Sequence, residues 1–181
     1  QQRLLMGEMR HRVKNLFAIV QGMIRLSARS ARTAEELAQS LSGRLDALMR
    51  AKEIVRPELI DRGKPHSEHA TLDALVRTIL QPYADVSYRE HILVRGVDVP
   101  IGAKAVTSLA LALHESATNA AKYGALSEPG GAVRIEWQAQ GTDLHLHWAE
   151  TGGPSIAAPP RTHGFGSILV DRSIAGELGG T

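Results

Sequence analysis

Residues 113–124 read LHESATNAAKYG, and this stretch decides the fold of the second half of the chain. Three polar side chains, Glu115, Asn119 and Tyr123, follow one another at intervals of four residues. A helix places residues at this spacing on one face. The final glycine ends the helical pattern, so we predict a long helix over residues 101–123 that carries a row of polar side chains.

The residue types in this row suit a metal ion and a phosphate group. Glu115 and Asn119 offer the oxygen ligands that Mg²⁺ prefers, and this ion needs few protein ligands because it keeps several waters. Lys122 lies beside them and can meet phosphate as a point charge. Plain solvated helices often carry such a face, but here an apolar run, Leu109–Leu113, precedes it and a glycine-rich loop follows the next predicted hairpin.

That loop begins at residues 148–154, WAETGGP, which end a predicted strand with the carboxylate of Glu150 and continue with Gly152 and Gly153. A carboxylate at a strand end can accept a hydrogen bond from an adenine amino group, and glycines let the backbone approach a nucleotide. The loop closes at the start of a helix, where free N–H groups favour phosphate. The closing residues are Gly164, Phe165, Gly166 and Ser167.

A single histidine, His11, lies among cations near the start of a helix predicted over residues 4–26. It falls on the side opposite the apolar residues, together with Glu8 and Asn15. An imidazole with an unperturbed pKa of about 6.5 is mostly neutral at pH 7, and nearby cations attract phosphate. The plain alternative is a surface histidine in a basic helix. The neighbouring cations are Arg10, Arg12 and Lys14.

A second amphipathic helix is predicted to follow a short turn. Thr33 and Glu36 form the pattern of a capping box, with Thr33 at the N-cap. Two such helices each expose an apolar face, and dimerisation into a four-helix bundle is the usual way to bury it. The apolar stripe of the second helix comprises Leu37, Leu41, Leu45, Leu48 and Val55.

The prolines between Pro57 and Pro65 interrupt the pattern, and we predict two domains, residues 1–60 and residues 61–181. Thr71 is placed to cap a helix that ends before Pro82. The other predicted elements are a β-like segment over 91–99, a hairpin over 132–139 and 143–149, a mobile loop over 151–166 and a helix over 167–178.

Composition narrows the classes of protein further. The 181 residues include no cysteine, which excludes disulfides, thiolate metal sites and a cysteine nucleophile. No apolar run approaches the roughly 18 residues of a membrane span, so we expect a cytoplasmic chain without a membrane segment. Because a helical pattern already begins at Gln1, we expect a piece of a longer protein.

Charge is distributed unevenly along the chain. Residues 1–60 hold 11 Lys and Arg against 6 Asp and Glu, a net of +5, while residues 61–181 hold 10 against 13, a net of −3. A basic helical half is compatible with an acidic protein partner or with nucleic acid. The lack of aromatic platforms argues against nucleic acid.

The order of these motifs resembles the HWE and HisKA_2 group of sensor histidine kinases of two-component systems, over essentially the whole chain. The string H-R-x-K-N that begins at His11 resembles a phosphoacceptor box, and residues 113–124 resemble an ATP-binding N box. His114 before Glu115, and Trp148 two residues before Glu150, match the His and the Trp-x-Glu for which the HWE group is named.

The resemblance implies an α+β protein. An antiparallel helical hairpin, half of a dimeric four-helix bundle, would be followed by a GHKL (Bergerat) ATP-binding sandwich. Such domains usually continue into another strand after the final glycine pair, so the resemblance implies that the second domain is truncated at its C-terminal end. ATP with Mg²⁺ would phosphorylate His11, and the receiver domain of a response regulator would then take the phosphoryl group on an aspartate. A covalently linked upstream sensory domain would control the reaction, and the kinase would be a homodimer that binds no nucleic acid.

The resemblance also assigns roles to single residues. Asn119 would bind Mg²⁺, Glu115 would assist through water, and Glu150 would read the adenine, a task that most relatives give to Asp. Lys122 and Tyr123 would line the nucleotide. The lid would hinge at Gly152, Gly164 and Gly166, and Gly153, Phe165 and Ser167 would belong to the same nucleotide-binding loop.

One departure from the family pattern concerns the general base that would act on the phosphoacceptor histidine. Arg12 stands directly after His11, where most histidine kinases place an acid, and Glu8, one helical turn earlier, is the substitute candidate. The expected catalytic set is therefore His11, Glu8, Asn15 and Glu115. Two rival functions remain: a GHKL ATPase or anti-sigma-type protein kinase, which His11 argues against, and a nucleotide-binding pseudokinase scaffold, which Asn119 and Lys122 argue against.

Overall fold

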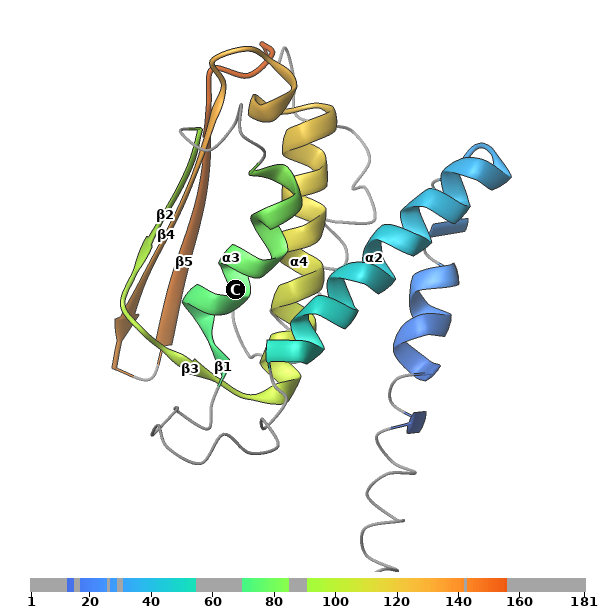
Figure 1. Cartoon of the computed structure of the whole chain (residues 1–181), viewed down its shortest axis with the longest axis horizontal. Helices are drawn as coiled ribbons and strands as arrows, with labels where there is room; N and C mark the ends of the chain where they lie inside the picture. Colours follow the sequence, from blue (N-terminus) through green and yellow to red (C-terminus); the bar gives the residue numbers. More distant parts are fainter. Residues whose placement is uncertain are drawn as a thin grey trace, which may run out of the picture. The chain divides into compact units, whose positions relative to one another are not determined.

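The computed structural model describes residues 13–14, 17–25, 27–28, 31–54, 70–84, 91–141 and 143–155 (Figure 1). The chain divides into two compact units, residues 1–45 and 46–181, and the division falls inside helix α2 (Ala34–Ile54). The domain boundary that the sequence predicts between residues 60 and 61 lies outside the described residues.

In the first unit, α2 begins at the predicted capping box. The N–H of Glu36 donates to Oγ1 of Thr33 at 3.1 Å, and the Glu36 carboxylate accepts the N–H of Arg32 at 2.8 Å. One N–H of the first helical turn, which has no partner within the helix, and one N–H just before the cap thus find side-chain partners. The capping box is confirmed, with the Glu36 carboxylate bonded one residue before the cap.

The burial of α2 matches its predicted apolar stripe only in part. Leu48 is buried, Leu37 and Leu41 are half-buried, and Val55 lies outside the described residues. Leu45 is 37% exposed, whereas its neighbour Arg44 is only 5% exposed. The Arg44 guanidinium donates to the hydroxyls of Ser27 and Ser40, and the Ser27 hydroxyl donates to the Met23 carbonyl at 2.6 Å. These bonds supply partners for a buried cation, which is costly without them. A hydrophobicity pattern cannot show this, because it assigns arginine to the surface.

The second unit contains two short sheets with helices. Strands β2, β4 and β5 form one sheet in the order β2-β4-β5, in which β2 and β4 are parallel and β4 and β5 antiparallel. Strands β1 and β3 form an antiparallel pair. The elements are β1 (Ala70–Thr71), α3 (Leu72–Leu80), η1 (Gln81–Tyr83), β2 (Ile92–Gly96), β3 (Pro100–Ile101), α4 (Ala103–Lys122), η2 (Ala125–Ser127), β4 (Ala132–Gln140) and β5 (Asp143–Thr151).

These elements confirm the predicted helices and hairpin of the described residues, with two differences. Helix α4 begins at Ala103 rather than at residue 101, because Pro100 and Ile101 pair with β1. The short strands β1 and β3 themselves were not predicted, since a pair of residues is too short to show a period. The hairpin turns at Gly141, whose φ is 60°.

Helix α3 has the predicted limits. The side chain of Thr71 accepts the N–H of Ala74 at 3.3 Å, and Pro82 follows the last helical turn within η1. On its exposed face, the hydrogen bond and charge of Asp73 raise the pKa of Arg77 above its usual value. Such an exposed pair adds little stability.

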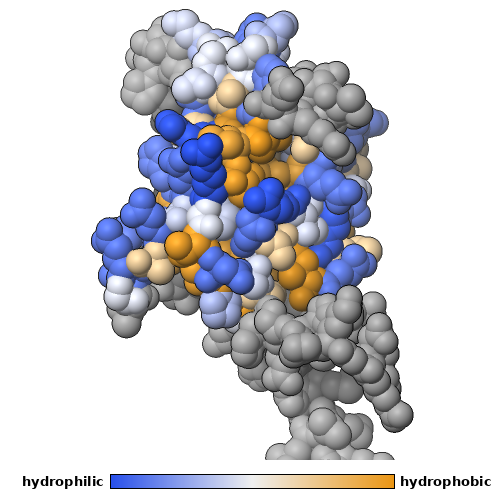
Figure 2. All heavy atoms as spheres, turned by 60° about the vertical axis from the view of Figure 1, so that its left-hand side comes forward, coloured by the Kyte–Doolittle hydropathy of each residue, from blue (hydrophilic) through white to orange (hydrophobic). Residues whose placement is uncertain are grey.

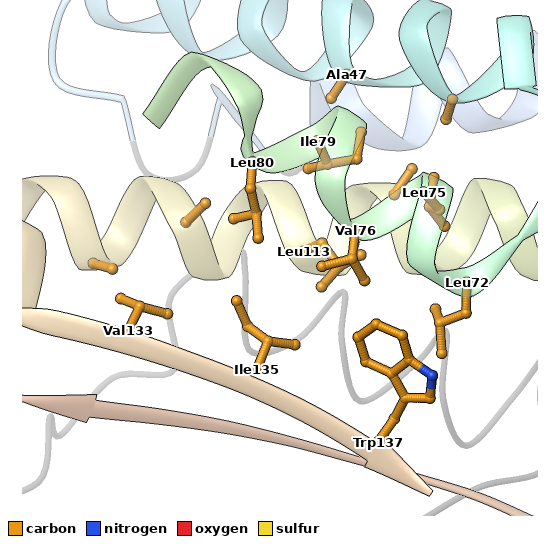
Figure 3. Packing of buried hydrophobic residues seen from close by; sticks show 14 of the residues in the cluster. Ala47, Leu72, Leu75, Val76, Ile79, Leu80, Leu113, Val133, Ile135 and Trp137 are labelled. Carbon is orange, nitrogen blue, oxygen red and sulfur yellow. The ribbon is translucent and has the colours of Figure 1, made fainter. Parts of the chain in front are cut away.

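The core of the second unit lies between the helices and one face of the larger sheet (Figure 3). Every second residue of β4 points inward, and α3 faces them with apolar residues at helical spacing. The indole N–H of Trp137 donates to the Val97 carbonyl at 2.7 Å, so its only polar atom is satisfied. The fully buried residues include Val133, Ile135 and Trp137 from β4, Leu72, Leu75, Val76 and Ile79 from α3, and Val106, Ala110, Ala117 and Ala120 from α4.

The sheet edge at β5 is less completely covered by the described residues. Leu146 and Trp148 pair with Trp137 and Ile135 and pack against the core, but both remain partly exposed, and Leu144 is 36% exposed. Figure 2 shows apolar surface gathered between hydrophilic side chains on one face of the molecule. No helix among the described residues is long and apolar enough to cross a membrane.

Candidate functional site

The last turn of α4 carries most of the predicted nucleotide-binding residues. The N–H groups of Tyr123 and Gly124 both donate to the carbonyl of Asn119, at 2.8 and 3.0 Å, and the helix ends at Lys122. A lysine is favourable there because the C-terminal end of a helix carries partial negative charge. The chain then enters η2 at Ala125.

The predicted row of polar residues on α4 runs from the interior to the surface. Glu115 is buried, at 7% exposed, while Asn119 and Lys122 are exposed and Tyr123 is 74% exposed. Only the later residues can therefore be reached freely from solvent. Glu115 lies one helical turn deeper than Asn119, where direct contact with a hydrated ligand is restricted.

Glu150, at the end of β5, is fixed beside the end of α4. One carboxylate oxygen, Oε2, accepts the N–H of Ala125 at 2.8 Å. The other, Oε1, accepts the indole N–H of Trp148 at 3.0 Å. Figure 1 shows the ends of α4 and β5 at the same end of the sheet. The structure thus brings Glu150 together with the segment that directly follows Lys122 and Tyr123.

Glycines permit this close approach of three backbone segments. A Cβ atom on Gly124 would lie 2.1 Å from Oε2 of Glu150, and one on Gly131 would lie 1.8 Å from the Ala125 carbonyl oxygen. One on Gly153 would lie 2.9 Å from the Ala125 nitrogen. Gly153 therefore packs against the protein's own backbone, and its predicted approach to a nucleotide stays a prediction. Gly152 also has a φ of 72°, which favours glycine.

His114, the residue that precedes Glu115, is buried on α4 at 8% exposed. Its Nδ1 lies 3.4 Å from the hydroxyl of Tyr83, and the two rings are tilted by 55° with centroids 6.4 Å apart. The Tyr83 hydroxyl lies 2.8 Å from Oγ1 of Thr118. In this structure His114 packs η1 against α4.

The remaining predicted site residues lie outside the described residues. This holds for the phosphoacceptor region, namely His11, Glu8 and Asn15, and for the end of the loop, namely Gly164, Phe165, Gly166 and Ser167. Their predicted roles stay predictions.

Sequence reasoning missed the contribution of two residues to this site. The backbone N–H of Ala125 binds Glu150, and no side-chain pattern can announce a backbone donor. The sequence places Trp148 in the Trp-x-Glu motif, but the motif alone assigns this residue no role. Its position two residues before Glu150 places both side chains on one face of β5. This two-residue spacing is the feature of the sequence from which the contact between Trp148 and Glu150 could have been predicted.

The arrangement offers three exposed groups of different chemistry within one region. The carboxylate of Glu150 accepts hydrogen bonds, the amide of Asn119 has an oxygen of the kind that can bind a metal ion, and the ammonium of Lys122 is of a kind that can attract anions. Within the described ranges, no group of three or more His, Asp or Glu side chains is arranged to hold a metal ion.

The comparison with known families identifies the chain. The profile of the HWE histidine kinase family matches residues 8–98, half of the chain, and the chain belongs to this family. Blue-light-activated histidine kinase 1 of Erythrobacter litoralis is 38% identical over 180 residues, which are 98% of this chain and 48% of that protein. The blue-light-activated histidine kinase of Brucella anthropi is 33% identical over 179 residues, 97% of this chain and 35% of that protein.

The chain thus spans half or less of the length of these curated relatives. Among solved structures, the histidine kinase domain of an Erythrobacter litoralis blue-light activated histidine kinase aligns with 94% of this chain and 81% of its own. The TM-score is 0.57 and the sequence identity 25%. A longer form of an Erythrobacter litoralis kinase has a TM-score of 0.64 at 22% identity over 51% of its chain, and supports the fold alone. The mixed helix and sheet arrangement is therefore that of a histidine kinase domain.

Proposed function

We propose that this chain is the phosphotransfer and catalytic core of a protein-histidine kinase. It transfers the γ-phosphoryl group of ATP to His11 and then to an aspartate on the receiver domain of a response regulator. Membership of the HWE histidine kinase family supports this. The observation that carries it is the position of the Glu150 carboxylate, held against the segment that follows the polar end of α4.

The proposal includes a finer description of the fold. Residues 1–60 form a dimerisation and phosphotransfer hairpin, and residues 61–181 form a GHKL-type ATP-binding domain. Helices α3 and α4 packed on one face of a mixed sheet support the second assignment. The capped helix α2 and the helical residues 17–25 support the first.

Adenine recognition follows from the chemistry of Glu150. An ionised carboxylate has about four lone-pair positions, and the protein uses one on each oxygen. Each oxygen can accept another hydrogen bond, and the side chain is exposed. An adenine amino group is a suitable donor, whereas guanine offers a carbonyl at the same position and would face the carboxylate unfavourably.

The triphosphate would lie toward the other exposed groups of α4. Lys122 provides positive charge for the phosphates, and Tyr123 provides an exposed aromatic face for the nucleotide. The residues fit Mg²⁺, because Asn119 presents an exposed amide oxygen and the ion takes most of its remaining ligands from phosphate and water. Glu115, which is buried, would act through an intervening water. When bound, Mg²⁺ neutralises charge on the phosphates.

The proposed transfer needs a neutral imidazole at His11. Its unprotonated ring nitrogen forms a bond to the γ-phosphorus while the bond from that phosphorus to the β,γ-bridging oxygen breaks, and ADP leaves. The ring's other nitrogen then gives up its proton to a base, for which Glu8 is the candidate. Most of the catalysis in such reactions comes from positioning and charge neutralisation.

The partners are proposed from the same chemistry. A receiver domain presents an acidic aspartate site, and the first 60 residues carry a net charge of +5. Opposite charges accelerate encounter between proteins. A sensory domain outside this chain would control the kinase, and a second copy would complete the helical bundle.

Incubation with γ-labelled ATP and Mg²⁺ tests the proposal. The parent chain should acquire a label that is stable to alkali and lost in acid, because phosphoramidates hydrolyse in acid. His11→Ala should remove it. Acid-stable label that persists in His11→Ala would instead favour a serine kinase of the anti-sigma type, and ATP hydrolysis without any label would favour a GHKL ATPase. Nucleotide binding with neither reaction would favour a pseudokinase scaffold.

A further inference from the structure

The Glu150 carboxylate is held by two donors that belong to different elements. Ala125 provides a backbone N–H from the start of η2, and Trp148 provides an indole N–H from β5 itself. A glutamate side chain has three rotatable bonds and loses considerable entropy when it is fixed. With both donors present, each carboxylate oxygen has a defined position. Without the indole donor of Trp148, only Oε2 would be held by a hydrogen bond, and Oε1 could take several positions.

We propose that Trp148 is a positioning residue for nucleotide recognition. Its indole N–H orients the Glu150 carboxylate so that the free lone pairs face the adenine amino group. The inference rests on the proposed function, because it concerns the same nucleotide site. It assigns Trp148 a role through Glu150 rather than through contact with the nucleotide.

The competing explanation is that Trp148 serves only to pack the sheet. Its ring is half-buried against the core and pairs with Ile135 across the hairpin. Packing, however, needs only an aromatic ring. The bond from the indole N–H to a carboxylate, 3.0 Å long, is the feature that phenylalanine cannot replace.

The chain supplies a matched control in Trp137. This is the other of the chain's two tryptophans, it lies on the neighbouring strand β4, and its indole N–H also donates a hydrogen bond. Its acceptor is the backbone carbonyl of Val97 at 2.7 Å, away from Glu150. Trp148→Phe and Trp137→Phe therefore make the same chemical change, and only the first affects the carboxylate.

Calorimetric binding of ADP, GDP and inorganic tripolyphosphate to the whole chain measures the effect. Trp148→Phe should weaken ADP about tenfold, the range expected for a charge-assisted hydrogen bond that is lost. Tripolyphosphate, which has no base, should bind as it does to the parent. The ratio of ADP to GDP affinity should fall. Trp137→Phe should leave this ratio unchanged even where it lowers the melting temperature.

A second comparison tests whether Trp148 acts through Glu150. Glu150→Ala removes both carboxylate oxygens, so adding Trp148→Phe to it should cause no further loss of ADP affinity. A further loss in the double variant would mean that the ring contacts the nucleotide directly and would overturn the inference. Equal loss of ADP and tripolyphosphate in Trp148→Phe would also overturn it, since general damage to the site would explain both.

The outcomes separate this inference from the proposed function. If the parent binds ADP and Glu150→Ala loses base discrimination while Trp148→Phe retains it, only the role of Trp148 is wrong. If the parent binds no adenine nucleotide, the proposed function fails and the role of Trp148 fails with it.

Discussion

The hydroxyl oxygen of Tyr83 lies 2.8 Å from Oγ1 of Thr118, so a hydrogen bond joins η1 to the C-terminal part of α4. The same hydroxyl lies 3.4 Å from Nδ1 of His114, one turn earlier on the helix. His114 is buried, and this contact gives a physical reason for a histidine directly before Glu115: it packs the helix that carries Glu115 and Asn119 against its neighbour.

Tyr83→Phe tests this link. It removes the hydroxyl and keeps the ring, so the free energy of unfolding should fall by about 0.5–1.5 kcal/mol. Both tryptophans lie in the second unit, so their fluorescence during urea unfolding reports on this unit. Tyr123→Phe is the control. Because Tyr123 is 74% exposed, this substitution should leave the midpoint of urea unfolding almost unchanged. Equal midpoints for the parent and both variants would remove Tyr83 from the link.

A second prediction concerns Gly124, which directly follows the C-cap of α4. In Gly124→Ala the new Cβ would meet Oε2 of Glu150 at 2.1 Å and the Cα of Ala120 at 2.9 Å, so the carboxylate must leave Ala125. We expect a loss of ADP affinity greater than the loss of tripolyphosphate affinity. Gly102→Ala is the control, because nothing lies within 4 Å of its Cβ position and its φ is −78°. Full ADP affinity in Gly124→Ala would contradict the geometry.

Sequence patterns predicted the parts of this fold that depend on local chemistry. The caps at Thr33 and Thr71 follow from side chains that bond their own neighbours, and the structure confirms both. The hairpin around Gly141 follows from two alternating segments joined at a glycine that can take a positive φ, and the structure confirms it as well. Contacts between distant segments were not predictable in this way. The bond from Glu150 to the Ala125 N–H spans 25 residues, and the burial of Arg44 depends on Ser27 in another helix.

In the candidate site, too, the sequence predicted what depends on local spacing and not what depends on contacts between distant segments. Spacing alone placed Glu115 and Asn119 on one helix, but it could not tell that the first is buried and the second exposed. It likewise could not tell that Gly153 packs against Ala125, and the predicted approach of Gly153 to a nucleotide stays a prediction. Burial and backbone contacts arise from tertiary packing, which cannot be deduced from the spacing of residues along one helix or strand.

The capping box of α2 allows a prediction for the first unit. Thr33→Ala removes the acceptor for the Glu36 N–H and should destabilise the helix by about 1 kcal/mol. Hydrogen exchange should show faster exchange of the amides in the first turn of α2. Ser42→Ala, at an exposed position inside the same helix, should leave that protection unchanged or raise it, since alanine favours helix. Unaltered exchange in Thr33→Ala would mean that the cap contributes no stability.

Asn119 provides the most direct test of the metal-binding role, because its side chain is exposed while its backbone carbonyl ends the helix. Asn119→Ala removes the exposed side-chain amide and leaves the backbone carbonyl in place, so the free energy of unfolding should change by less than about 0.5 kcal/mol. Transfer of label from ATP should nevertheless stop, since the substitution removes a ligand of Mg²⁺. Asn119→Asp keeps an oxygen at that position and should retain part of the activity at raised Mg²⁺. Gln39→Ala, which removes an exposed amide from α2, should change neither property. Labelling of Asn119→Ala at the parent's rate under saturating Mg²⁺ would show that the ion is held elsewhere.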